Sequence, residues 1–273
     1  ILDNYRSDAT LYLGGPTMIT SDMMDYIRSD LVLFGTAVAL IFAIMLYLFF
    51  GNIWLVTLPL INALVTTFIT AGFLGFMDWK ISVVSSNFIA LLLILTISLT
   101  VHVLVKVNEL KKENPNFKEA LSESVNQMFL PCFFAALTTA IAFLSLLLGD
   151  LKPVIEFGKM MAFGISIAFI STFTLLPSLL SIIGNIATKD RLNLHKITNS
   201  ILGFSKENTS TIYVVFVLSF AALLFGASRL EVENRFIDYF DKNTEIHQGM
   251  LEIDTYLGGT STLDIIIKEP DFE

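Results

Sequence analysis

The feature that most constrains this chain is a series of long stretches without any Asp, Glu, Lys or Arg, at residues 31–77, 81–105, 124–149, 160–188 and 208–228. A helix needs about 20 apolar residues to cross the hydrocarbon core of a bilayer. The first stretch is long enough for two crossings, with a turn at Gly51 and Asn52. Because lipid offers no hydrogen-bond partners to an open backbone, we expect helices. The sequence therefore predicts six membrane-spanning helices, at 31–50, 53–76, 83–105, 127–148, 160–184 and 209–228.

Basic residues are concentrated in the loops at 106–123 and 186–207, whereas the loops on the opposite side carry few. Loops rich in Lys and Arg stay on the cytoplasmic side, so we expect both ends of the chain to be periplasmic in a bacterial inner membrane. The net charge of −8 fits acidic outer segments, and nothing in the charge pattern favours nucleic acid.

The segments that flank the spans are polar and mixed, as in soluble α+β domains. We expect a strand at 9–14, a helix at 21–30 that is capped by Ser21 and can run straight into the first span, a helix at 243–259 and a strand beyond it. Residues 1–30 and 229–273 would then be pieces of two outer domains of a longer protein. On the cytoplasmic side, Asn116 is a candidate cap of a surface helix over 117–127, and 186–207 is predicted to be a linker helix. Lys152 and Glu156 are expected on a solvated outer loop.

Two features of the spans predict how the helices pack. Gly158 and Gly164 lie on stripes of small residues that allow close approach between helices. Pro177 predicts a kink or a stop in its helix.

Signatures of enzymes, cofactors and metals are not found in the sequence. There is no phosphate-binding glycine loop with a lysine. His102, His195 and His247 lie in separate regions, so their spacing forms no metal cluster. Cys132 is the single cysteine and lies within a predicted span. We therefore expect no enzymatic activity, no cofactor and no metal.

Several stretches resemble the resistance–nodulation–division (RND) superfamily, and in particular its lipid-exporting MMPL branch. They are LYLGGPTMITSDMMDYIRSDL, FFGNIWLVTLPLINALVTTFITAGFLGFMDWKISVVSSN, LPCFFAALTTAIAFLSLLLGDLKPVIEFGKMMAFGISIAFISTFTLLPSLL and YLGGTSTLDIIIKE. The resemblance implies an RND-type half-bundle of family helices two to seven between pieces of two periplasmic porter domains. It also implies a second repeat in the remainder of the protein. Its expected partners are the bilayer, a hydrophobic substrate and that second repeat, with a periplasmic carrier protein and a second copy of the chain as further candidates.

In the fourth helix of this family, an Asp-Tyr pair typically precedes a histidine by four residues, and the Asp carries the transported proton. Aligned on His102, the Asp position holds Ser98 and the Tyr position holds Leu99. A hydroxyl does not titrate near neutral pH as a carboxylate does, and the six predicted spans contain no carboxylate. We therefore expect the acidic member of any proton relay to lie in the other half of the protein.

Ser98 and His102 are four residues apart and share one helix face, whereas Thr96 and Thr100 point almost oppositely. One interpretation has Ser98 and His102 facing the partner half of the protein. The alternative makes His102 a buried, hydrogen-bonded structural residue. The Thr96–Thr100 pair can bond to carbonyls of its own helix and be structurally silent. Thr138 and Thr139 either contact the polar face of the fourth helix or pack helices as small residues. The candidate relay residues are Ser98, Thr100, His102, Thr138 and Thr139.

Two functions remain open from the sequence. The first is an exporter of lipids or other hydrophobic molecules, driven by the proton gradient through an asymmetric relay. The second is a membrane protein that binds lipid as a sensor or scaffold without transporting it, of the sterol-sensing or Patched-like kind.

Overall fold

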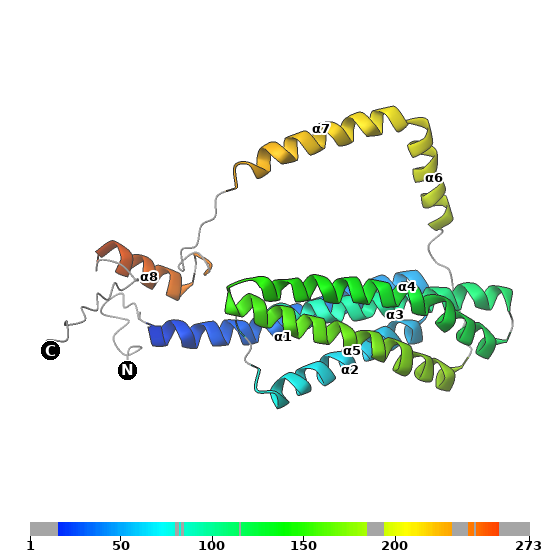
Figure 1. Cartoon of the computed structure of the whole chain (residues 1–273), viewed down its shortest axis with the longest axis horizontal. Helices are drawn as coiled ribbons and strands as arrows, with labels where there is room; N and C mark the ends of the chain where they lie inside the picture. Colours follow the sequence, from blue (N-terminus) through cyan, green and yellow to red (C-terminus); the bar gives the residue numbers. More distant parts are fainter. Residues whose placement is uncertain are drawn as a thin grey trace, which may run out of the picture. The chain divides into compact units, whose positions relative to one another are not determined.

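The computed structural model describes residues 16–79, 82, 85–114, 116–184, 194–230, 240–242 and 244–256. Every regular element in these ranges is helical (Figure 1). In chain order these elements are α1 (Pro16–Phe50), α2 (Ile53–Phe76), η2 (Ser85–Asn87), α3 (Phe88–Glu113), α4 (Phe117–Ser145), η3 (Leu146–Leu148), α5 (Lys152–Ile183), α6 (Leu194–Glu207), α7 (Thr209–Ala227) and α8 (Glu245–Tyr256).

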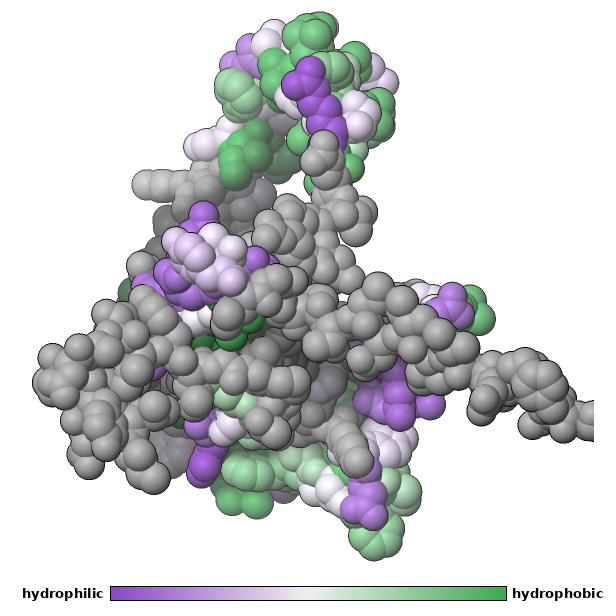
Figure 2. Space-filling view, turned by 90° about the vertical axis from the view of Figure 1, so that its left-hand side faces the viewer, coloured by the Kyte–Doolittle hydropathy of each residue, from purple (hydrophilic) through white to green (hydrophobic). Residues whose placement is uncertain are grey.

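Six of these helical segments are long and apolar enough to cross a membrane. They are Met23–Phe50, Ile53–Phe76, Ser85–Glu113, Phe117–Leu148, Lys152–Ile183 and Thr209–Ala227. The prediction of six spans is confirmed at the level of length and composition. Figure 2 shows hydrophobic side chains on the surface of the described helices, as expected for segments that contact lipid.

Helix ends follow local capping chemistry. Gly51 has a φ of 62°, which turns the chain between α1 and α2. The Asn52 side chain then accepts the Trp54 backbone N–H at 3.0 Å, and the Asn116 side chain accepts the Lys118 N–H at 3.2 Å at the start of α4. The turn predicted at Gly51–Asn52 and the cap predicted at Asn116 are both confirmed.

Three predicted boundaries were wrong, because each helix continues past the edge of its apolar stretch. α1 begins at Pro16, so Ser21 lies inside the helix and is no cap, whereas the expected run of this helix into the first span is confirmed. α3 continues to Glu113, because the first residue that disfavours a helix is Asn114, which precedes a proline. α4 joins the predicted surface helix and its span into one element.

Helices α2 to α5 form a bundle in which α3 and α5 each pack against the other three helices. The largest core cluster joins Leu58 of α2, Ile97 and Leu104 of α3 and Leu176 of α5, all of which are at most 1% exposed. α1 contributes Leu46 near its end and Phe50, its last residue, to the same cluster. This arrangement buries the apolar faces of the four helices in one core.

Close approach between helices depends on two glycines of α5. A Cβ atom at Gly158 would lie 2.5 Å from the Phe143 carbonyl oxygen of α4. A Cβ atom at Gly164 would lie 3.0 Å from Leu92 Cδ1 of α3. The predicted packing role of both residues is thereby confirmed. α5 continues through Pro177 to Ile183, so Pro177 does not stop the helix.

A second compact unit comprises residues 1–26 and 201–273. In its described part, every residue of α7 is exposed. Ile246 and Met250 of α8 are buried against Phe240, and the Phe240 ring lies 6.3 Å from the Tyr26 ring. The helix predicted at 243–259 corresponds to α8, and the linker helix predicted at 186–207 corresponds to α6. The strands predicted at 9–14 and near the end of the chain lie outside the described residues.

Candidate functional site

Asn62 is the centre of a buried polar cluster between α2, α3 and α5. Its side-chain Nδ2 donates to Thr100 Oγ1 at 2.8 Å and to Thr172 Oγ1 at 3.1 Å. Ser171 Oγ donates to Asn62 Oδ1 at 2.6 Å. Asn62, Thr100 and Thr172 are fully buried, and Ser171 is 6% exposed. We call these four residues the Asn62 node.

Further buried polar side chains lie on α2 and α3 at helical spacing from the node. On α2, Thr66 and Thr70 follow Asn62 at successive four-residue steps and are fully buried. On α3, Thr100 Oγ1 donates to the Thr96 carbonyl at 2.8 Å, and Thr96 Oγ1 donates to the Leu92 carbonyl at 2.7 Å. The bonding of this pair to its own helix, which the sequence left as an option, is confirmed.

One buried hydroxyl of this polar stripe is not satisfied. Thr66 Oγ1 has no hydrogen-bond partner among the described residues, although its side chain is fully buried. By contrast, the Thr70 hydroxyl donates to the Thr66 carbonyl at 2.8 Å. A buried hydroxyl without a partner is energetically unfavourable, so Thr66 is a point of weakness in the bundle interior.

Neutral amide and hydroxyl groups limit what the node can do. They can hold helices together or hydrogen-bond a water molecule, but they do not exchange protons near neutral pH. Asn62 was missed by sequence reasoning. The available signal was an amide in the middle of an uncharged run, since polar groups in membranes tend to face the bundle interior.

Ser98 and His102 lie on the opposite face of α3 and are exposed on the described bundle. Leu91 and Val105 on this side of α3 are exposed as well. The alternative in which His102 is a buried interior residue does not hold for the described bundle. The orientation of this face toward another part of the protein stays a prediction.

Thr138 and Thr139 have their hydroxyls bonded within α4. Thr138 Oγ1 donates to the Phe134 carbonyl at 2.8 Å, and Thr139 Oγ1 donates to the Ala135 carbonyl at 2.7 Å. Other residues of α4, Cys132 and Ala136, pack toward the core. Among the five candidates, the structure therefore places Thr100 in the Asn62 node, Ser98 and His102 together on the exposed face of α3, and the two α4 threonines apart from both.

No group of three or more His, Cys, Asp or Glu side chains that could hold a metal ion occurs in the part of the chain that the structure describes. The candidate residues thus form two groups, the buried neutral polar groups of the Asn62 node and, on the opposite face of α3, Ser98 and His102.

Comparison with known proteins gives a consistent pattern. A sequence model of the MMPL family matches residues 2–202. A membrane protein of Methanocaldococcus jannaschii is 27% identical over 161 residues, which are 59% of this chain and 42% of that protein. Hopanoid transporters of Rhodopseudomonas palustris and Burkholderia multivorans are 22% and 24% identical, over 67% and 64% of this chain and 21% and 20% of their own lengths. The chain thus spans less than half the length of these curated relatives.

Proposed function

Because the chain belongs to the MMPL family, as its match over residues 2–202 shows, we propose that it is the membrane half-module of an RND-type transporter for lipids or other hydrophobic molecules. The observation that carries this proposal is the family match, and the similarity to two hopanoid transporters supports it. The six apolar helices supply the multi-pass membrane domain that such a protein needs. The role is that of a transporter rather than an enzyme.

The exposed face of α3 supports a role for the remaining protein in transport. Ser98 and His102 are polar, yet they lie on a helix that is apolar enough to span the bilayer. Polar side chains at membrane depth usually face protein or water rather than lipid. Since the chain covers 42% or less of each relative, a second half is available to cover this face. In this proposal an acidic group of that half lies beside His102 and forms the proton relay with it, a role in which histidine is common.

Location and orientation follow from the same proposal. The transporter lies in the inner membrane with the basic loops in the cytoplasm and both ends of the chain in the periplasm. A periplasmic carrier protein and a second copy of the chain remain candidate partners.

Transport by the full-length protein in liposomes tests this function. With a fluorescent lipid as substrate and an imposed pH gradient, we expect movement of the lipid that stops when the gradient is collapsed. His102→Ala should lower the rate about ten-fold or more, as expected for loss of a positioned proton-exchanging group, and Ser98→Ala should lower it less. Ser178→Ala, which removes an exposed hydroxyl of α5 that bonds only to the Thr174 carbonyl, is the matched control and should transport normally.

Two outcomes would contradict the proposal. Normal transport by both α3 variants would show that this face takes no part in coupling. Stable lipid binding without movement under any gradient would favour the lipid sensor or scaffold, for which the lack of a carboxylate in the predicted spans is the supporting observation.

A further inference from the structure

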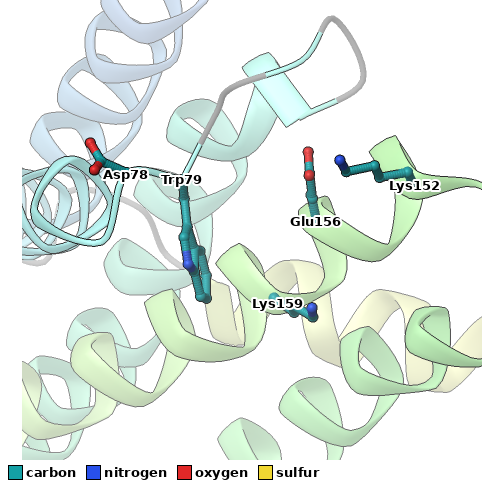
Figure 3. A pocket seen from close by; sticks show the side chains of 5 residues that line it. All are labelled: Asp78, Trp79, Lys152, Glu156 and Lys159. Atoms are coloured by element: carbon teal, nitrogen blue, oxygen red, sulfur yellow. The ribbon is translucent and has the colours of Figure 1, made fainter.

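Among the described residues, charged side chains do not join α2 to α5 at the end of the bundle where α2 ends and α5 begins. Asp78, Trp79, Lys152, Glu156 and Lys159 line a cavity of about 290 Å³ there. Figure 3 shows the Asp78 carboxylate directed away from Glu156 and from both lysines. Lys152 and Glu156 were expected on a loop, but they lie in the first turns of α5, because the helix begins directly at Lys152, ahead of the proline that favours a helix start. The two helices are instead joined deeper in the bundle, at the Asn62 node.

α3 is held against α2 and α5 at two levels. At the first level, Thr100 accepts a hydrogen bond from Asn62 Nδ2 at 2.8 Å, and the same amide donates to a hydroxyl of α5 at 3.1 Å. At the second level, a Cβ atom at Gly164 would lie 3.0 Å from Leu92 Cδ1 and 3.6 Å from Thr70 Cγ2. The two levels are eight residues apart on each helix, which is about 12 Å along the axis. Apolar contact at the second level fixes the distance between the helices, whereas the directional hydrogen bond at the first level also fixes the rotation of α3.

The rotation of α3 decides where Ser98 and His102 point. Thr100 lies midway between them in the sequence, and its side chain is fully buried whereas theirs are exposed on the described bundle. Residues two apart in a helix project about 200° apart around its axis. The bond that holds Thr100 inward therefore holds the two other side chains outward.

A small rotation of α3 is enough to displace His102. Side chains end about 5–6 Å from the axis of a helix, so a rotation by about 30° moves such an end by about 3 Å. A misplacement of about 1 Å at a reacting group can lower a rate about 100-fold. Proton exchange at His102 is thus expected to depend on what fixes the rotation of its helix.

We propose that Asn62 is a positioning residue for proton exchange at His102. Its bond to Thr100 holds α3 in the rotation at which His102 faces the remaining protein. Its bonds with Ser171, which donates to Asn62 Oδ1 at 2.6 Å, and with Thr172 anchor the same amide on α5. Asn62 acts through α3 and exchanges no proton itself. This inference rests on the transport function proposed above, in which an acidic group of the remaining protein lies beside His102.

Lipid transport by the full-length protein in liposomes tests this role through a double-mutant cycle. Asn62→Leu should lower the rate per folded protein about ten-fold or more, because it removes the bond that orients α3. In a protein that already carries His102→Ala, the same change should lower the rate little further, because both changes act on one step. A role in stability alone would lower both rates by the same factor. Thr67→Val, whose hydroxyl bonds to the Ala63 carbonyl of its own helix, is the control and should transport normally.

Thr100→Val tests the same role with a smaller change to the fold. Of the bonds of Asn62 it removes only the one to α3 and leaves those to α5. It should lower the rate in the same way as Asn62→Leu and, like it, have little effect when His102 is already alanine. Thr96→Val is its control, because the Thr96 hydroxyl is equally buried and donates to the Leu92 carbonyl of its own helix.

The distance between two spin labels measures the rotation of α3 without relying on transport. Labels are attached at Ser98→Cys and at Ile182→Cys, an exposed position of α5, in full-length protein from which other cysteines have been removed. Double electron–electron resonance should show a distance that shifts or broadens by about 3 Å in Asn62→Leu and in Thr100→Val, and that is unchanged in Thr67→Val and Thr96→Val.

The two measurements separate failure of this proposal from failure of the transport function. An unchanged label distance in Asn62→Leu, or an equal further loss of transport in the His102→Ala background, would overturn the positioning role and leave the transport function standing. No transport by the unmodified protein would overturn the proposed function, and with it the part of Asn62 in proton exchange.

Discussion

At the scale of single residues, Asn62 joins three helices of the described bundle through side-chain hydrogen bonds. Its amide bonds to one hydroxyl of α3 and to two hydroxyls of α5. Because the three partners come from two other helices, the side chain fixes the rotation of three helices about their axes. Apolar contacts alone are less directional, and lipid-facing helices gain no hydrophobic driving force from packing. The node therefore contributes to the specificity of the fold.

Replacing Asn62 with leucine, which has a similar shape, should destabilise the protein. The change removes three hydrogen bonds, each worth about 0.6 kcal/mol on average inside a membrane, so we expect a loss of about 2 kcal/mol in the free energy of unfolding. Unfolding by a denaturing detergent in mixed micelles measures this. Thr67→Val is the control, because within the described residues the Thr67 hydroxyl bonds to the Ala63 carbonyl of its own helix and to no other helix. A loss no larger than that of the control would contradict a bridging role for Asn62.

Replacing Thr66 with valine should, in contrast, stabilise the protein. The hydroxyl of Thr66 is buried without a partner among the described residues, and valine has nearly the same shape without the polar atom. Removing an unsatisfied hydroxyl should raise the free energy of unfolding by about 1 kcal/mol. The same detergent titration, run beside Thr67→Val, measures the change. A decrease instead would indicate that a water molecule bonds to this hydroxyl in the bilayer.

At the scale of elements, the sequence predicts what depends on composition and misses what depends on packing. An uncharged run of about 20 residues has few alternatives to a spanning helix, so six spans could be predicted. Helix ends beyond the bilayer were misjudged, because the backbone of α3 continues through Lys106 and Glu109, whose side chains form an ion pair at 3.1 Å. The direction of Asn62 was not predictable from α2 alone, because the residues that bond to it lie 38, 109 and 110 positions away. The face of α3 that carries Ser98 and His102 could be recognised from spacing, but not what covers it.

The packing of α4 against α5 should be sensitive to Gly158. An added methyl group would lie 2.5 Å from the Phe143 carbonyl oxygen, which is backbone and cannot move aside as a side chain can. We expect Gly158→Ala to lower the free energy of unfolding by about 1–3 kcal/mol, as overpacking typically does.

Gly72→Ala is the matched control for this change, because nothing lies within 4 Å of the added atom. Alanine favours helix by up to about 1 kcal/mol over glycine, so this variant should be neutral or slightly more stable in the same assay. Equal effects of the two changes would show that the contact between α4 and α5 is looser than the structure indicates.

At the scale of the whole molecule, the chain spans less than half the length of the curated relatives that it matches. In the proposed transporter, the described bundle would present two kinds of surface, one that contacts lipid and one that contacts the remaining protein. Phe68 of α2, which is 74% exposed, represents the first kind. The polar face of α3 has the character of the second, since a hydroxyl and an imidazole are unfavourable against hydrocarbon.

Spin labels at these positions of the full-length protein distinguish the two surfaces. In a background from which Cys132 and any cysteine outside this chain have been removed, a label is attached at Phe68→Cys, at Ser98→Cys or at His102→Cys, and its collision rate with oxygen is measured in liposomes. Oxygen dissolves in the hydrocarbon, so a label that contacts lipid collides with it often. We expect a high rate at position 68 and clearly lower rates at positions 98 and 102, because in the proposed transporter the remaining protein covers this face of α3. If the rates at positions 98 and 102 were as high as the rate at position 68, α3 would contact lipid at these two positions. The proton exchange proposed beside His102 would then have no protein partner.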